Sequence, residues 1–111
     1  MATIKFTSAG GIEATSFKST SSRKFKKDIA PTKVSGLDIV NSTDVVDFKF
    51  ISDIKEVPHV GFIAEDTDPI LSTPELDGMD YTNCIGVLLK AVQELTEKVE
   101  NLEDEIRQLK K

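Results

Sequence analysis

Tryptophan is absent from this sequence of 111 residues, and cysteine and histidine occur once each, as Cys84 and His59. A single cysteine excludes an internal disulfide, which is typical of a reducing compartment. Because Cys84 and His59 lie far apart, and the sequence has neither a calcium-binding nor a phosphate-binding loop, we expect no metal and no other cofactor. No apolar run approaches the length of a membrane span, so we expect no membrane partner.

Aromatic residues make up only 6% of the chain, and aliphatic side chains supply most of its hydrophobic fraction of 39%. A chain of this length has room for one domain with a modest core. A core without large aromatic side chains buries little area, and association with other copies is one way to bury more. Cys84 lies among apolar residues at the predicted start of a helix, where we expect a buried and inert thiol.

The net charge of −5 is distributed unevenly. Residues 1–33 carry a net charge of +5, and residues 34–111 carry −10. This asymmetry is compatible with an acidic partner such as nucleic acid, and also with attraction between the two parts of the chain. We favour the second interpretation because the basic cluster is short and alternates with Phe25 and Ile29. More than fifty residues separate that cluster from the C-terminal heptads, unlike in a basic zipper, so we expect no nucleic-acid partner.

Two short strands are predicted near the N-terminus. Apolar and polar residues alternate over residues 4–6 and again over 12–17, with Gly10-Gly11 between them. A ribbon of two such short strands is marginal on its own. We therefore expect residues 1–20 to continue a β structure that lies upstream in a longer protein.

The middle of the chain is predicted to form a second hairpin. Residues 35–40 read as a short helix or turn, and alternation predicts strands over residues 45–51 and 59–64, joined by a loop of several residues. Residues 65–80 are rich in proline, aspartate and glycine, which is typical of a connecting loop with room for one helical turn.

A long helix is predicted from Thr82 onward, with Asp80 or Thr82 as its N-cap. Apolar residues recur there at alternating spacings of three and four without a break. Taking the first of them as position a places β-branched residues at every a and leucine at every d, the heptad pattern of a coiled coil. We call these positions the seam, and they are Ile85, Leu88, Val92, Leu95, Val99, Leu102, Ile106 and Leu109.

The residues beside the seam predict a parallel arrangement of copies. In a parallel coiled coil a g residue faces the e residue five positions later on the neighbouring chain. Lys98 would then face Glu103, and Glu105 would face Lys110. The alternative is an amphipathic helix packed on its own domain, whose stripe would drift from a strict seven-residue period. The a and d residues by themselves favour two strands.

One stretch, residues 21–29, has side chains that could carry chemistry. A serine hydroxyl becomes an effective nucleophile when a base takes its proton, and a lysine that is buried or lies near other cations can act as that base. Ser21 lies five residues before Lys26, and Ser–Lys dyads are a recognised variant of the catalytic triad. A solvated basic loop is the competing interpretation of the same residues.

Three segments follow one another along the chain. Residues 21–29 read SSRKFKKDI, residues 59–66 read HVGFIAED, and DYT at 80–82 is followed by LLKAVQEL at 88–95. In these segments the sequence resembles the C-terminal intramolecular chaperone domain of phage tail spikes, tail fibres and neck appendages, which myelin regulatory factors share. That family's motifs are approximately S-D-x-R-x-K-x-N-I, H-x-G-F-I-A-Q-E, and D-Y-(S/T) before L-L-x-K-A-I-Q-E-L. The ordered set spans residues 21–111.

The resemblance implies a single-turnover, self-cleaving serine endopeptidase. Members of the family trimerise, help an upstream β-helical stalk to fold in register, and are released by a cut before the motif serine, here the Thr20–Ser21 bond. By this match Ser21 is the nucleophile, Lys26 is the general base and His59 assists, although a structural role for His59 stays open. The resemblance places the chain in the host cytoplasm during virion assembly, and its parent protein in the virion tail or an appendage.

We therefore predict an α+β fold, with a small β-hairpin and loop region followed by a long C-terminal helix in a parallel, homotrimeric coiled coil. Residues 1–20 would end the upstream stalk, 21–81 would form the chaperone body and 82–111 the coiled-coil helix. The expected partners are copies of the chain, with a dimer as the alternative to a trimer, and the stalk of the same polypeptide.

The sequence departs from the family motifs at two notable positions. Ser22 and Lys24 stand where the family usually has Asp and Arg, while Asp28 for Asn and Glu65 for Gln are milder changes. The first two departures could alter how the scissile turn is held. An assembly module that does not cleave itself is therefore the alternative function.

Overall fold

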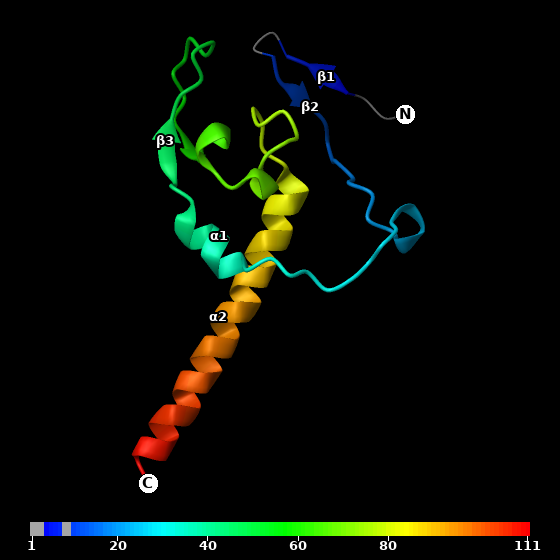
Figure 1. The fold of residues 1–111 in the computed structure, drawn as a ribbon. Helices are drawn as coiled ribbons and strands as arrows, with labels where there is room; N and C mark the ends of the chain where they lie inside the picture. The colour runs from blue at the N-terminus through cyan, green and yellow to red at the C-terminus, as the bar shows by residue number, and fades with distance from the viewer. Residues whose placement is uncertain (1–3, 8–9) are drawn as a thin grey trace. The chain divides into compact units, whose positions relative to one another are not determined.

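The computed structural model describes residues 4–7 and 10–111 of the chain (Figure 1). The chain divides into two compact units, the first formed by residues 1–32 with 49–57 and the second by residues 33–48 with 58–111. The predicted α+β class is confirmed, because antiparallel hairpins precede a long C-terminal helix. The three-part division into stalk end, body and helix stays a prediction.

The first unit contains a small hairpin. Strand β1 (Lys5–Phe6) pairs antiparallel with β2 (Ile12–Glu13), which places Lys5 opposite Glu13. The turn relies on Gly10, whose φ of 84° suits glycine and whose N–H donates to the Thr7 carbonyl at 3.0 Å. The predicted pair of strands is confirmed, but the strand expected over residues 12–17 ends at Glu13, where its pairing with β1 ends. Residues 1–3 and 8–9 of the same predicted segment lie outside the described residues.

Residues 49–57 also belong to the first unit, and they form a loop. The Asp53 carboxylate accepts hydrogen bonds from the backbone N–H groups of Lys55 and Val57, each at 3.0 Å. An aspartate that bonds the backbone a few residues onward stabilises a turn. The strand predicted over residues 45–51 therefore stops early, at Phe48.

The second unit contains the predicted second hairpin. Strand β3 (Val46–Phe48) pairs antiparallel with β4 (His59–Gly61), with Phe48 opposite His59 and Val46 opposite Gly61. Gly61 leaves room for the Phe48 ring, because an added Cβ would lie 3.2 Å from the ring carbon Cε1. The strand expected over residues 59–64 is shorter than predicted, since the chain turns into the 3-10 helix η2 (Ala64–Asp66).

The loop predicted over residues 65–80 is confirmed, with more local structure than expected. Besides η2, it contains the 3-10 helix η3 (Pro69–Leu71), which begins at the N-cap Asp68. The Asp68 carboxylate accepts from the Ile70 N–H at 2.9 Å. A bridge between Ser72 and Met79 then returns the chain towards the start of the long helix.

Two helices complete the second unit. Helix α1 (Gly36–Ser42) matches the short helix expected near residues 35–40. Helix α2 (Tyr81–Leu109) is the long helix in Figure 1, about 44 Å in length at a rise of ~1.5 Å per residue. Its N-cap is Asp80, whose carboxylate accepts from the Asn83 N–H at 3.0 Å. The predicted helix is confirmed, and of the two candidate caps Asp80 is the correct one.

The core of the second unit is thin. Its buried apolar residues are Ile39, Leu71, Val87 and Ala91, which come from α1, η3 and α2. At Gly36 the backbones of α1 and α2 nearly touch, because an added Cβ would lie 2.7 Å from the Val87 carbonyl oxygen. Cys84 is only half-buried, so the expectation of a buried thiol is met in part. Desolvation, followed by the Asp80 carboxylate, raises the pKa of the Cys84 thiol.

Candidate functional site

The side chains of Ser21 and Lys26 meet in the first unit. The Lys26 Nζ donates a hydrogen bond to the Ser21 Oγ at 2.7 Å. Both residues are exposed to solvent. The structure therefore brings together the two residues that the sequence analysis singled out as nucleophile and base, at a distance that allows proton transfer between them. Their catalytic role stays a prediction.

A single turn of 3-10 helix, η1 (Arg23–Phe25), creates this contact. Ser22 is its N-cap, with an Oγ that accepts from the Lys24 N–H at 3.4 Å. The Ser22 and Arg23 carbonyls accept from the N–H groups of Phe25 and Lys26, each at 3.1 Å. The turn reverses the direction of the chain, so that the residues on either side of it, five apart in sequence, face one another.

Asp28 continues the turn with an unusual backbone conformation. Its φ is 55°, in the left-handed region that most residues avoid and that asparagine and aspartate tolerate best. The position corresponds to the asparagine in the first motif described above. Aspartate tolerates this conformation, as does the asparagine that the motif has at this position.

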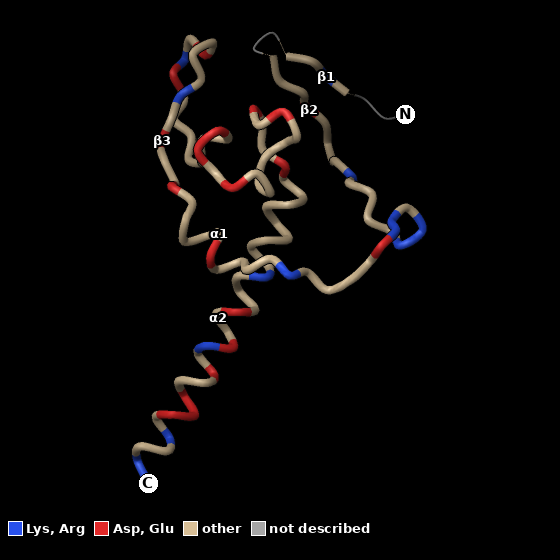
Figure 2. Tube along the Cα trace, viewed as in Figure 1, with Lys and Arg blue, Asp and Glu red and all other residues tan. Residues whose placement is uncertain are grey.

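The surroundings of the pair are strongly basic. Figure 2 shows the basic residues concentrated around η1. The Lys24 ammonium lies over the Phe25 ring, 5.2 Å from its centroid, which is a cation–π contact at an exposed site. The pair therefore lies in a basic and solvent-exposed part of the chain.

His59 lies elsewhere, on β4 of the second unit. Its ring stacks on the Phe48 ring, with centroids 5.5 Å apart and planes 20° apart. The two residues are also opposite each other in the β3–β4 pair. This contact supports a structural role for His59. An assisting role in catalysis stays a prediction, because Ser21 and Lys26 belong to the other unit.

The sequence analysis missed a polar clamp between α1 and α2. One Glu94 oxygen accepts from the Gly36 N–H at 2.6 Å, and the other accepts from the Ser35 hydroxyl at 3.2 Å. The carboxylate thus caps the first turn of α1 and places a negative charge at its N-terminus. Glu94 belongs to the LLKAVQEL segment, but its spacing of 58 residues from Gly36 gave no local signal for the pairing.

The seam lies uncovered along α2 in the single chain. Exposure of its eight side chains ranges from 47% at Val99 to 85% at Leu109. The side of α2 that packs on its own unit uses other positions, namely Cys84, Val87, Ala91 and Glu94. Every residue from Leu95 to Lys111 is exposed. The alternative of a helix whose seam packs on its own domain does not describe this chain.

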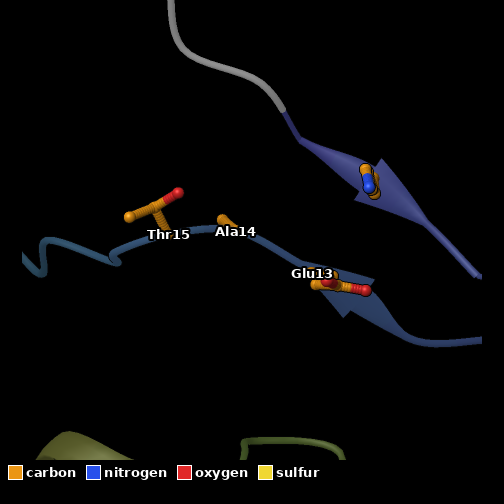
Figure 3. Close-up of a pocket in the computed structure, with 4 residues that line it drawn as sticks. Glu13, Ala14 and Thr15 are labelled. Atoms are coloured by element: carbon orange, nitrogen blue, oxygen red, sulfur yellow. The ribbon is translucent and has the colours of Figure 1, made fainter.

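Other features of the described residues offer little chemistry. A hollow of about 200 Å³ lies over the first hairpin, lined by Lys5, Glu13, Ala14 and Thr15, and Figure 3 shows Glu13 on β2 with Thr15 beyond its end. Within residues 4–7 and 10–111, no three histidine, cysteine, aspartate or glutamate side chains are grouped to bind a metal ion. None of the helices described combines the length and apolar character that a membrane span requires.

Comparison with known proteins gives one family. The model of a peptidase family described as "chaperone of endosialidase" matches residues 21–76. The matched segment begins at Ser21 and includes η1, Lys26, the second hairpin and His59. No curated protein and no solved structure matches the chain.

Proposed function

Because the chain belongs to the peptidase family described as chaperone of endosialidase, we propose that it is an intramolecular chaperone for a fibrous phage tail or appendage protein. It trimerises, sets the register of the β stalk that precedes it, and is released by self-cleavage at the Thr20–Ser21 bond. Residues 1–20 are the last part of that stalk. The work is done in the host cytoplasm while the virion assembles.

Assembly is the first step of the proposed function, and the seam carries it. Each buried leucine, isoleucine or valine side chain contributes about 1.5–3 kcal/mol when it leaves water, and each copy offers eight of them. The Lys98–Glu103 and Glu105–Lys110 pairs favour parallel helices in the same axial register. Once the helices associate, the upstream segments meet at the high effective concentration of an intramolecular reaction. Slow non-local β pairing then starts from an aligned end.

Cleavage is the second step, and Ser21 and Lys26 carry it. The Ser21 Oγ attacks the Thr20 carbonyl carbon while the Lys26 amine accepts the hydroxyl proton. The C–N bond breaks as Lys26 returns this proton to the leaving nitrogen, which leaves Thr20 joined to the Ser21 Oγ as an ester. Water then hydrolyses the ester, giving a Thr20 carboxylate, a free Ser21 amino group and the regenerated hydroxyl.

In the proposed mechanism cleavage waits for assembly, and the exposure of the pair supports that order. Only a neutral amine can accept the hydroxyl proton, and water stabilises the charged form of an exposed lysine. In the single chain the Lys26 side chain is exposed and acts as a donor to Ser21. Packing of a folded stalk over this turn would exclude water from the pair. Cleavage then reports that the stalk has folded.

The observation that carries the proposal is the 2.7 Å contact between Ser21 Oγ and Lys26 Nζ, at the first residue of the matched family segment. The test is to express the chain fused to its own upstream stalk and to measure intact masses. The wild type should yield a fragment that begins at Ser21, whereas Ser21→Ala and Lys26→Ala should leave one uncut polypeptide. The neighbouring variants Ser22→Ala and Lys27→Ala are matched controls that keep both members of the pair.

A second candidate is an assembly module of a tail or appendage protein that does not cleave itself. The departures at Ser22 and Lys24 favour it, because a serine and a lysine replace the usual aspartate and arginine of the turn. The same mass measurement separates the two functions. A wild-type fusion that trimerises and stays uncut supports the second candidate, and a cut that persists in Ser21→Ala refutes the proposed nucleophile.

A further inference from the structure

An apolar pocket of about 210 Å³ lies in the second unit, beside the seam. Apolar atoms form nearly all of its surface, and six residues that line it are Val40, Phe62, Leu71, Cys84, Val87 and Leu88. Leu88 is itself a seam residue, so the pocket opens next to the line along which copies would associate. Cavities of about 150 Å³ with apolar walls hold a molecule as large as benzene. A branched aliphatic side chain therefore fits here.

Leu89 follows Leu88 and is unusual for its position. It is an e residue of the heptad, where charged residues are common in coiled coils. Its side chain is nevertheless apolar and 61% exposed in the single chain. The remaining e positions are occupied by Thr96, Glu103 and Lys110. The chain thus exposes one apolar e residue, at the level of the apolar pocket.

Charge complementarity assigns this leucine a position in the assembly. The Lys98–Glu103 and Glu105–Lys110 pairs are opposite in charge only when a g residue faces the e residue five positions later on a parallel neighbour. Applied two heptads earlier, the same offset places Leu89 of one copy opposite Cys84 of the next. Cys84 lines the pocket.

We propose that Leu89 of each copy inserts into the apolar pocket of its neighbour. The inference rests on the parallel assembly of the proposed function and adds to it a specific contact between the chaperone bodies. The contact joins the coiled coil to the pocket that α2 forms with α1, Phe62 and η3. It therefore extends the alignment of the helices to the body of the second unit.

The thiol of Cys84 provides a reporter, because a neighbour's Leu89 would cover it. The experiment measures the rate of alkylation by iodoacetamide in the full chain, at a concentration where sedimentation shows complete assembly. Leu89→Ala should raise the rate roughly tenfold, since it uncovers the thiol without breaking the seam. Leu89→Met, which nearly conserves volume, should stay within about twofold of the wild type. Gln108→Ala is the control, a truncation at an exposed position of α2 that is off the seam and far from the pocket, and it should leave the rate unchanged.

The outcomes separate the inference from the function on which it rests. If the wild type sediments as single chains, the proposed assembly fails, and the inference fails with it. If the wild type assembles but Leu89→Ala leaves Cys84 as protected as before, the assembly stands and the insertion of Leu89 is wrong. Equal acceleration by Leu89→Ala and Gln108→Ala would also overturn it, because protection of Cys84 would then not depend on Leu89.

Discussion

The two halves of α2 differ in how they are stabilised. From Tyr81 to Glu94 the helix packs on α1 and η3 and contributes Val87 and Ala91 to the core. From Leu95 to Leu109 every residue is exposed and the apolar seam is uncovered. An isolated helix of that length is marginal in water. The comparison teaches that one continuous helix has two different environments: its first half packs on its own chain, and its second half leaves an apolar seam uncovered, which the proposed function assigns to binding other copies.

The largest effect is expected from placing charge in the second half. The double variant Leu95→Glu/Leu102→Glu should weaken assembly by more than about a thousandfold, because each buried leucine contributes about 1.5–3 kcal/mol in every copy. Sedimentation equilibrium should show single chains, and circular dichroism should show partial loss of helix. Gln93→Glu/Gln108→Glu adds the same charge off the seam and should assemble normally. A seam variant that sediments like the wild type would remove the basis of the proposed function.

The first half can be broken without touching the seam. Gly36→Ala should lower the free energy of unfolding by about 3 kcal/mol or more, because the added Cβ would collide with the α2 backbone. Gly86→Ala should have the opposite effect, because Gly86 lies within α2 and an added Cβ would meet open space. The substitution should raise the free energy of unfolding by about 1 kcal/mol. Urea denaturation followed by circular dichroism measures both. Equal effects of the two substitutions would contradict the close approach of α1 and α2.

A smaller effect in the same half is expected at the clamp. Glu94→Gln keeps the shape of the side chain but removes the negative charge of the group that accepts hydrogen bonds from Ser35 and Gly36. It should lower the free energy of unfolding by about 1 kcal/mol. Glu97→Gln removes an exposed carboxylate one turn later and should change stability by less than about 0.5 kcal/mol. Thermal unfolding at fixed chain concentration compares the two. A clamp variant as stable as its control would show that the two hydrogen bonds contribute nothing.

The smallest expected effect on stability tests whether the second halves of neighbouring α2 helices run parallel. Lys98→Glu and Glu103→Lys should each lower stability, and the double variant should recover about 0.5 kcal/mol per pair in low salt. Residues five apart do not face each other on one helix, so recovery must come from a neighbouring copy. A double-mutant cycle by thermal unfolding measures the coupling. Absence of recovery would argue against parallel copies in this alignment.

The sequence predicted best what depends on local pattern. The uninterrupted spacing of the seam predicted helix α2, and the observed N-cap, Asp80, was one of the two candidates. The spacing of Ser21 and Lys26, together with the motif, predicted that these two residues act as a pair. Their contact is local, because residues 21–26 form a single turn. The strands were predicted in place but too long, since their ends depend on Asp53 in one loop and on the 3-10 turn at Ala64. Neither the Gly36 approach nor the Glu94 clamp could be predicted, because both join segments more than fifty residues apart.

The contact between Ser21 and Lys26 forms entirely within the turn at 21–26 and needs no other chain for its geometry. If the chain cleaves itself as proposed, variants that slow cleavage should therefore fall into two kinetic groups. Changes within the turn alter a first-order rate that is independent of protein concentration. Changes in the seam leave that rate intact and instead make the half-time of cleavage depend on dilution.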